Sequence, residues 1–240
     1  MKKIVALNLK MNLGYEEALE YVNTIKDKIS DTYEVIFFPS AIFLHLFKKS
    51  GYQIGSQNVH YENKGAFTGE ISPYQLKTSG IDYTIVGHSE RRLYFKEDDK
   101  LINKKVIGAL KNNLKVILCV GETDEERRLK KTALVISNQI ERALKNIDSF
   151  DLRDVIIAYE PVWAIGSGKT PSKEETADAI KFIKKIIFQR YDINIRVLYG
   201  GSVNKDNIKT IMNIENVDGI LVGSSSFNPN YLISMIDIID

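Results

Sequence analysis

The sequence predicts an α/β protein, a single-domain (β/α)8 barrel with eight parallel strands formed by residues 1–240. Short runs rich in β-branched and aromatic residues alternate with longer segments of helical spacing, and eight such pairs follow one another. No Pro-, Gly- or Ser-rich linker divides the chain, whose 240 residues suit one barrel domain of about 250 residues. Because periodicity alone does not show closure, an open doubly wound sheet remains an alternative at this point.

The expected strands are short apolar runs. Val35-Ile36-Phe37-Phe38 is apolar at every position, which is typical of a parallel strand covered on its outer face by helices. The full set of expected strands is Ile4–Leu7, Val35–Phe38, Gln53–Gly55, Tyr83–Val86, Lys115–Val120, Val155–Tyr159, Ile195–Tyr199 and Gly219–Val222.

Three helix starts carry capping boxes, in which a Ser or Thr and a Glu or Gln three residues later bond each other's backbone N–H groups. They are Ser72-Pro73-Tyr74-Gln75, Thr123-Asp124-Glu125-Glu126 and Ser172-Lys173-Glu174-Glu175. Pro73 also suits a first helical position. The third box begins the clearest helical segment, expected at Ser172–Arg190.

Charge and cysteine content narrow the class of protein. The 33 basic and 31 acidic residues are scattered, so we expect no nucleic-acid partner and no membrane surface. No apolar run approaches the roughly 18 to 20 residues of a membrane span. The single cysteine, Cys119, excludes an internal disulfide and favours a reducing compartment, so we expect a cytoplasmic protein.

Polar side chains follow three of the expected strands: Asn8 and Lys10 after the first, His88 and Glu90 after the fourth, and Glu160 after the sixth. In a barrel these strand ends converge on one pocket. A lysine, a histidine and a carboxylate there would supply positive charge, a hydrogen-bonding electrophile and a base for removing a proton beside a carbonyl. Taken singly, each residue is more simply explained as part of a salt bridge or a cap on the rim.

The segment from Glu160 to Thr170 places apolar residues, including Trp163, between a proline and two glycines. This pattern indicates an active-site lid, with a loop packed permanently on the surface as the alternative. Gly168-Lys169-Thr170 resembles the end of a nucleotide-binding P-loop. However, Trp163 occupies the position where that motif needs a glycine.

Two glycine clusters follow the seventh and eighth strands, at Tyr199–Ser202 and Val222–Ser226. Barrels frequently bind phosphate there, because glycine lets the backbone approach and exposed N–H groups attract an anion. Turn geometry explains either cluster equally well in isolation.

We expect neither a metal nor a cofactor. The three histidines have no metal-ligand spacing, one cysteine cannot form a thiolate site, and no dinucleotide-binding motif is present. Cys119 lies in an apolar strand and is interpreted as a core residue. Asn12, Glu62 and Asn63 are assigned to the solvated surface.

Seven motifs, in order, resemble the triosephosphate isomerase family along nearly the whole chain. They are Asn8-Leu9-Lys10-Met11-Asn12, Gln57-Asn58, Gly65-Ala66-Phe67-Thr68-Gly69-Glu70, Val86-Gly87-His88-Ser89-Glu90-Arg91-Arg92, Cys119-Val120-Gly121-Glu122, Glu160 to Thr170, and Tyr199-Gly200-Gly201-Ser202-Val203.

The resemblance implies reversible conversion of dihydroxyacetone phosphate to D-glyceraldehyde 3-phosphate through an enediol(ate), in glycolysis and gluconeogenesis and without a cofactor. Glu160 would move the proton, His88 would polarise the carbonyl, and Lys10 would supply fixed positive charge. Asn8 would bond the substrate and Glu90 would support these groups. The catalytic histidine of this family works with a neutral imidazole, so the resemblance implies a neutral ring for His88. Ser89 is expected to cap a short helix beside it.

By the same resemblance, a small phosphorylated triose is the substrate. The backbone N–H groups of Gly166, Ser202, Gly223 and Ser224 would hold its phosphate. Members of the family are usually homodimers, in which the loop Gly65–Glu70 inserts beside the partner's active site.

The chain departs from the family pattern at three positions: Leu9 replaces a Trp, Ser167 a Thr, and Ser224 the second glycine of a Gly-Gly pair. Ser224 matters most, because its N–H can bind phosphate only if the position needs no positive φ angle.

Three other functions remain alternatives at this stage: a barrel that binds phosphate without catalysis, a Schiff-base aldolase using Lys10, and a P-loop ATPase.

Overall fold

The computed structural model of the protein describes residues 2–165 and 170–240. Eight parallel strands form a closed barrel in the order of the sequence, because β1 pairs with both β2 and β8. Closure excludes the open-sheet alternative and confirms the predicted fold class. The strands are β1 (Ile4–Asn8), β2 (Glu34–Phe38), β3 (Gln53–Ser56), β4 (Tyr83–Val86), β5 (Lys115–Val120), β6 (Val155–Tyr159), β7 (Arg196–Tyr199) and β8 (Gly219–Val222).

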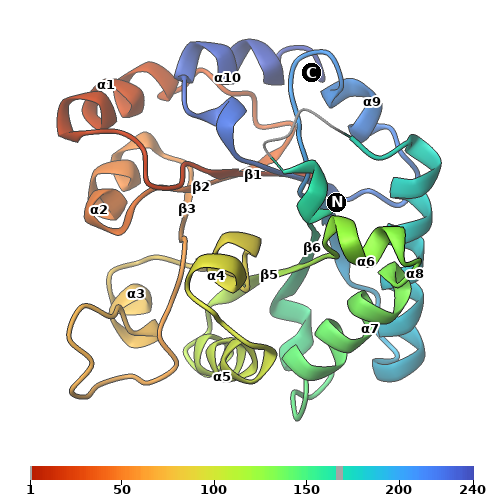
Figure 1. Cartoon of the computed structure of the whole chain (residues 1–240). Helices are drawn as coiled ribbons and strands as arrows, with labels where there is room; N and C mark the ends of the chain where they lie inside the picture. Colours follow the sequence, from red (N-terminus) through yellow and green to blue (C-terminus); the bar gives the residue numbers. More distant parts are fainter. Residues whose placement is uncertain (1, 166–169) are drawn as a thin grey trace.

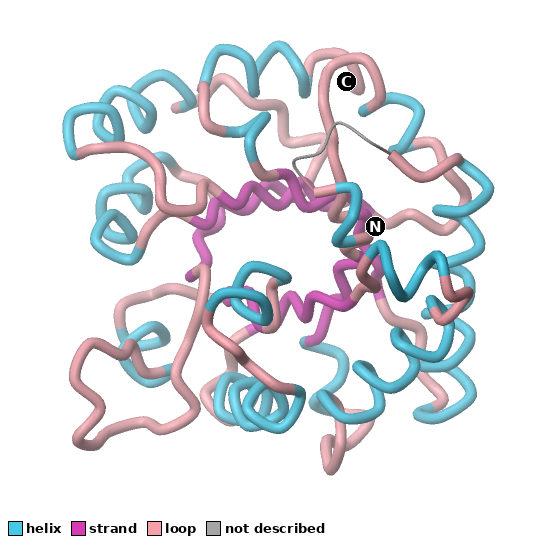
Figure 2. Tube along the Cα trace, viewed as in Figure 1, coloured by secondary structure: helices cyan, strands magenta, loops and turns pink. Residues whose placement is uncertain are grey.

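Helices surround the barrel on its outer side (Figures 1 and 2). The α-helices are α1 (Tyr15–Ile25), α2 (Leu44–Phe47), α3 (Pro73–Thr78), α4 (Ser89–Tyr94), α5 (Asp99–Leu110), α6 (Asp124–Arg128), α7 (Thr132–Ala143), α8 (Lys173–Tyr191), α9 (Ile208–Met212) and α10 (Pro229–Ile236). Short 3-10 helices are η1 (Ala41–Phe43), η2 (Lys48–Ser50), η3 (Asp151–Asp154), η4 (Val162–Ala164) and η5 (Ser224–Ser226). Within the described residues, no helix is long and apolar enough to cross a membrane.

The predicted strands agree with the observed ones to within one residue at each end. Ile195 was expected to begin the seventh strand, but β7 starts at Arg196, which is the first residue to pair with β6. Three strands are longer by one residue than expected: β1 includes Asn8, β2 includes Glu34 and β3 includes Ser56. Pairing with a neighbour decides these ends, whereas the sequence shows only the apolar run.

All three predicted capping boxes are present, at Ser72, Thr123 and Ser172. The expected cap at Ser89 was wrong. Ser89 is the first residue of α4, and the preceding His88 caps the helix by accepting a hydrogen bond from the Glu90 N–H. Sequence preferences favour serine at this place, whereas the observed chain path brings the imidazole ring over the helix start.

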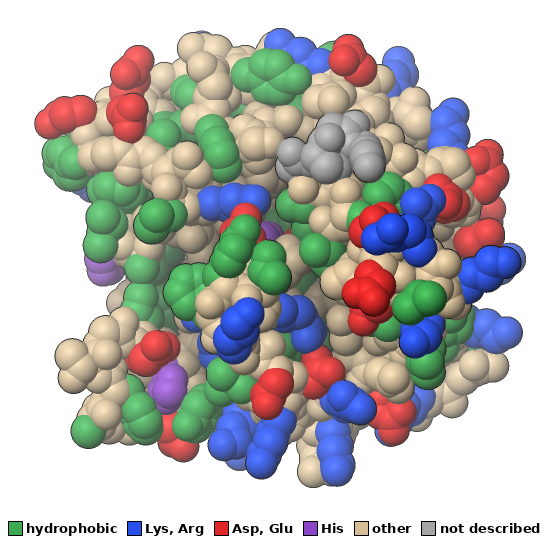
Figure 3. All heavy atoms as spheres, viewed as in Figure 1, with side chains coloured by type: hydrophobic (Ala, Val, Ile, Leu, Met, Phe, Trp, Pro, Cys, Tyr) green, Lys and Arg blue, Asp and Glu red, His purple; other side chains and the backbone are tan. Residues whose placement is uncertain are grey.

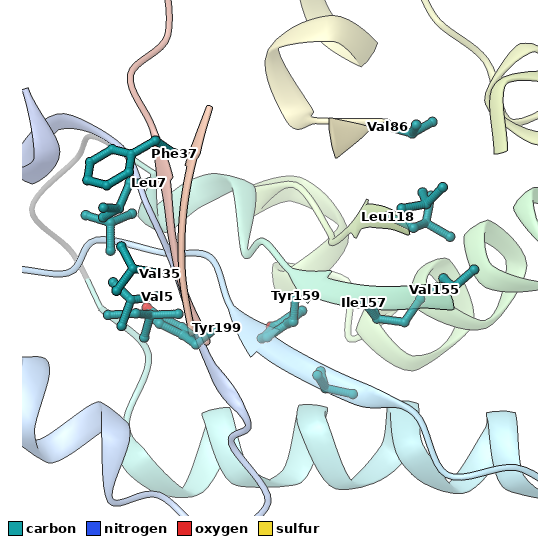
Figure 4. Close-up of a cluster of buried hydrophobic side chains, with 14 of the residues drawn as sticks. Val5, Leu7, Val35, Phe37, Val86, Leu118, Val155, Ile157, Tyr159 and Tyr199 are labelled. Atoms are coloured by element: carbon teal, nitrogen blue, oxygen red, sulfur yellow. The ribbon is translucent and has the colours of Figure 1, made fainter. Parts of the chain in front are cut away.

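Strand side chains alternate between two buried clusters. One set faces outward and packs against the helices. Val5, Leu7, Val35 and Phe37, which are labelled in Figure 4, belong to this set. The other set fills the inside of the barrel and consists of Ile4, Ala6, Ile36, Phe38, Tyr83, Ile85, Ile117, Cys119, Ile156, Ala158, Leu198 and Leu221. The barrel is therefore a packed core, and an internal site can form only where the strands end.

Candidate active site

A cavity of about 180 Å³ opens at the carboxyl ends of β1, β4, β6, β7 and β8. Basic, acidic and histidine side chains come together near the centre of this face in Figure 3. The lining residues are Asn8, Lys10, Asn12, His88, Glu160, Ile165, Gly200, Gly201, Ser202, Val203, Leu221, Val222, Gly223, Ser224 and Phe227. The structure therefore brings together seven residues predicted from separate strand ends: Asn8, Lys10, His88, Glu160, Ser202, Gly223 and Ser224.

Glu160 directly follows β6 and is only 3% exposed. Its Oε1 lies 3.2 Å from Nε2 of His88, and its Oε2 accepts a hydrogen bond of 3.1 Å from the Ser89 N–H. The Glu160 backbone N–H donates to the Val120 carbonyl at 2.7 Å. Both the main chain and the carboxylate of this residue are thus held in place.

Two glycines leave the space that Glu160 occupies. A Cβ atom at Gly200 would lie 2.8 Å from Glu160 Cγ, and one at Gly121 would lie 1.7 Å from the Glu160 carbonyl oxygen. Both distances are shorter than ordinary contacts. The loop after β7 and the loop after β5 therefore need glycine at these positions because Glu160 is packed between them.

The hydrogen bonds of His88 define its tautomer. Its Nδ1 accepts a 3.2 Å hydrogen bond from the Glu90 N–H, so the ring proton belongs on Nε2. Nε2 faces the cavity and Glu160. The imidazole can therefore donate a hydrogen bond to a group in the cavity.

Lys10 adopts a left-handed backbone conformation, with φ of 51°. Three side chains hold this unfavourable backbone: Asn8 Oδ1 accepts from the Lys10 N–H at 3.0 Å, and Gln57 and Ser40 donate to the Lys10 carbonyl. The Lys10 ammonium group lies 2.5 Å from Oε1 of Glu90. Glu90 itself lies outside the lining of this cavity but contacts two lining residues, Lys10 and His88.

The backbone N–H groups of Ser202 and Ser224 have no hydrogen-bond partner among the described residues. Ser224 begins η5, and it is not among the residues with positive φ. The replacement of a family glycine by Ser224 therefore does not strain the backbone, and its N–H stays available to an anion. Gly166 and Ser167 lie outside the described residues, as do two further residues of the expected lid, Gly168 and Lys169.

Sequence reasoning missed some of the cavity lining. Asn12 was assigned to the solvated surface, but it lines the cavity and its amide donates to the Leu9 carbonyl at 3.1 Å. Its position four residues after Asn8, in the same motif, was a usable signal. Phe227 and Val203 add an apolar wall. Val203 ends the motif Tyr199–Val203 but was not singled out as a lining residue, and Phe227 lies outside the quoted motifs. Glu62 and Asn63 are exposed, as expected.

Cys119 is buried inside the barrel, as expected. Burial, together with the negative charge of the nearby Glu160, raises the pKa of its thiol well above the ordinary value. A thiol in this state is a poor nucleophile at neutral pH. No group of three or more potential metal ligands occurs in the described part of the chain.

Comparison with known proteins finds relatives that match nearly the whole chain. A family model described as triosephosphate isomerase matches residues 3–239. The triosephosphate isomerase of Alkaliphilus metalliredigens (strain QYMF) is 44% identical, and the match covers 98% of this chain and 99% of the relative. That of Alkaliphilus oremlandii (strain OhILAs) is 42% identical over the same shares, and that of Finegoldia magna is 43% identical over 94% of each chain.

Proposed function

The chain belongs to the triosephosphate isomerase family, and we propose that Glu160, His88 and Lys10 carry out the family's reaction in the cavity described above. The protein is an aldose–ketose isomerase that interconverts dihydroxyacetone phosphate and D-glyceraldehyde 3-phosphate through an enediol(ate). The match to an isomerase family argues against the three alternatives: a Schiff-base aldolase, a P-loop ATPase and a barrel that binds phosphate without catalysis.

Glu160 is the base in this proposal. A carboxylate is a suitable acceptor for the proton on the carbon beside a carbonyl, and this one lines the cavity while being almost fully removed from water. The observation that carries the proposal is the 3.2 Å approach of Glu160 Oε1 to His88 Nε2, because base and electrophile must both reach the same two carbons.

His88 polarises the substrate carbonyl through its Nε2–H, and Lys10 stabilises the negative charge that develops on the oxygen. Asn8, which is 5% exposed at the end of β1, supplies a further polar group to the cavity. Glu90 is a supporting residue, since its carboxylate pairs with Lys10 and its N–H orients His88.

The N–H groups of Ser202, Gly223 and Ser224 hold the phosphate in this proposal, with Gly166 as a fourth donor. Gly223 supports this assignment because a Cβ atom there would lie 3.2 Å from Lys10 Cε, so a side chain would crowd the lysine. A phosphate bound there would lie near the Lys10 charge.

We test the base with Glu160→Gln, which keeps the size of the side chain and removes the proton acceptor. We expect kcat to fall by on the order of 10² to 10⁴-fold in a coupled assay that converts glyceraldehyde 3-phosphate to dihydroxyacetone phosphate. Glu20→Gln, which alters an exposed carboxylate on α1, is the matched control and should turn over like the parent. Near-normal turnover of Glu160→Gln would contradict the assignment.

We also infer a homodimer. A groove of about 510 Å³ adjoins the active-site cavity, shares Lys10 and His88 with it, and extends to Met11 and Phe95. Met11 and Phe95 are 94% and 64% exposed, which is typical of an unfilled apolar interface.

The loop Gly65–Glu70 suits the role of the inserted element. The Phe67 ring packs 4.3 Å from the His60 ring and covers Gly65, where a Cβ atom would lie 2.5 Å from it. Gly65 also has a φ of 152°, which favours glycine. A loop stabilised by its own side chains loses little conformational entropy on docking, which supports its insertion into the groove of a second copy.

The cytoplasmic location stays a prediction. It is supported by the single, buried Cys119, which is compatible with a reducing compartment.

A further inference from the structure

The strands β7 and β8 are the least paired neighbours in the barrel. They share one aligned pair of residues, Tyr199 and Ile220, whereas every other pair of neighbouring strands shares at least two. Toward the strand starts, Asp218 adds two bonds: its N–H donates to the Val197 carbonyl at 2.9 Å, and its Oδ2 accepts from the Val197 N–H at 2.8 Å. Main-chain pairing therefore does little to fix the distance between the loops that follow β7 and β8.

These two loops carry the N–H groups proposed to hold phosphate. Ser202 lies in the loop after β7, whereas Gly223 and Ser224 directly follow β8. All three residues line the active-site cavity. A phosphate held from both sides requires the loops to keep their separation, because a displacement of roughly half an ångström or more is enough to break a hydrogen bond.

Ser225 connects the two loops at the active-site end of the barrel. Its hydroxyl donates to the Val203 carbonyl at 2.6 Å. Ser225 directly follows Ser224, and Val203 directly follows Ser202, so the bond joins the residues next to one proposed donor on each loop. Val203 is buried, which limits the competition of water for this bond.

Both partners of this bond belong to segments that are held by other contacts. The Ser226 hydroxyl donates to the Gly223 carbonyl at 2.7 Å within η5, and the Ser226 carbonyl accepts from the Tyr21 hydroxyl of α1 at 2.5 Å. On the other loop, the Asn207 amide donates to the Ser202 carbonyl at 3.0 Å. The bond across the two loops therefore joins segments that are each fixed to their own surroundings.

We propose that Ser225 is a positioning residue for the substrate phosphate: its hydroxyl sets the separation of the two loops whose N–H groups hold that phosphate. The inference rests on the proposed phosphate site. Within the described part of the chain, the cavity lining includes Ser224 but not Ser225, so Ser225 acts through its neighbours. The substrate and the transition state both carry the phosphate, so a looser pair of loops should weaken binding with little effect on proton transfer.

The experiment uses inorganic phosphate as a competitive inhibitor in the coupled assay. We expect Ser225→Ala to raise the Ki for phosphate and the KM for glyceraldehyde 3-phosphate by about three- to tenfold, as the loss of one hydrogen bond implies. The kcat should change by less than about twofold. Ser225→Thr keeps the hydroxyl and should restore both constants to near the parental values.

Tyr231→Phe is the matched control. It removes the hydroxyl that accepts a 3.3 Å hydrogen bond from the Lys205 N–H, another contact between the segments that follow β7 and β8. Neither of these residues adjoins a proposed phosphate donor in the sequence, so we expect a parental Ki. An equal rise in Ki in this control would indicate a general loosening and would overturn the specific role of Ser225. A parental Ki in Ser225→Ala, or a Ser225→Thr variant as weak as alanine, would do the same.

The pattern of constants also separates positioning from a simple loss of folded protein. A smaller folded fraction lowers the apparent kcat but leaves KM and Ki unchanged, and that result in Ser225→Ala, checked by thermal unfolding, would contradict the inference. Failure of the proposed phosphate site would appear in the parent itself, as no competitive inhibition by phosphate, and would remove the inference with it. The two proposals therefore fail in distinguishable ways.

Discussion

At the scale of single residues, the position of the proposed base depends on glycines as much as on its own hydrogen bonds. Gly121 faces the main chain of Glu160, and Gly200 faces its side chain. The sequence motifs contain both glycines, and a turn explained the cluster around Gly200 equally well. Only the packed loops show that the missing Cβ atoms make room for the main chain and the side chain of Glu160.

Gly200→Ala should therefore damage catalysis more than folding. The new methyl group would lie 2.8 Å from Glu160 Cγ, so the side chain must move by several tenths of an ångström. We expect kcat to fall by about tenfold or more, measured in the coupled assay beside a thermal melt. Gly14→Ala, whose Cβ would make an ordinary 3.6 Å contact with Glu17, is the control. An unchanged kcat in folded Gly200→Ala would show that Glu160 tolerates the displacement.

At the scale of elements, side-chain hydrogen bonds connect the first residues of four strands. Tyr83 of β4 donates to Glu34 Oε1 at 2.5 Å, and Arg196 of β7 donates to Glu34 Oε2 at 2.7 Å. Lys115 of β5 lies 3.2 Å from the Tyr83 hydroxyl. Each of these residues is the first of its strand, and Glu34 is the first of β2. This polar group closes the end of the barrel opposite the active site.

Because Glu34 is held by these contacts, we expect the free energy of unfolding to depend on pH. Burial by itself would raise the pKa of Glu34, but the hydrogen bonds from Tyr83 and Arg196 and the positive charges of Arg196 and Lys115 outweigh it, so its pKa lies below the ordinary value of 4.5. Because the folded state lowers the pKa, Glu34 stabilises the fold fully above about pH 4.5 and loses this effect as pH falls through its folded pKa.

Glu34→Gln should remove that dependence. We expect the free energy of unfolding of the parent to fall more steeply on acidification below about pH 4.5 than that of the variant, and the variant to be less stable at pH 7. Urea unfolding at a series of pH values measures both. The control Glu20→Gln, on the exposed face of α1, should keep the parental slope. Parallel pH curves for Glu34→Gln and the parent would mean that the ion pair forms equally in the unfolded chain.

At the scale of the whole molecule, the inferred dimer places its contacts directly beside the active site. Light scattering should give a mass of twice 27.3 kDa for the parent. Phe95→Glu places a charge in the groove and should yield monomers with reduced turnover. Phe150→Glu, an equally large change at a 74% exposed phenylalanine before η3, should stay dimeric. A parent that is monomeric and fully active would contradict the homodimer.

The alternation of strands and helices, the strand bounds to within one residue and the three capping boxes were readable from the sequence. These features depend on local periodicity and on bonds between residues three apart, and the observed β4, β5, β6 and β8 match the expected ranges. The candidate cavity residues were found in the same way, because strand ends carry them. Ser89 failed as a cap because the ring of His88 competes for the same helix start.

By itself, the sequence determined an eightfold αβ repeat, the residue types at its strand ends, and the family through its ordered motifs. Tertiary structure decided four further features. They are the closure of the barrel through the β1–β8 pairing, the contact of Glu160 with His88, the hydrogen bonds of Glu34, and the hydrogen bond of Ser225 to Val203. Each of these joins residues that are far apart in the chain or on different elements. Local propensity carries no information on such contacts, because packing of the whole barrel brings the partners within bonding distance.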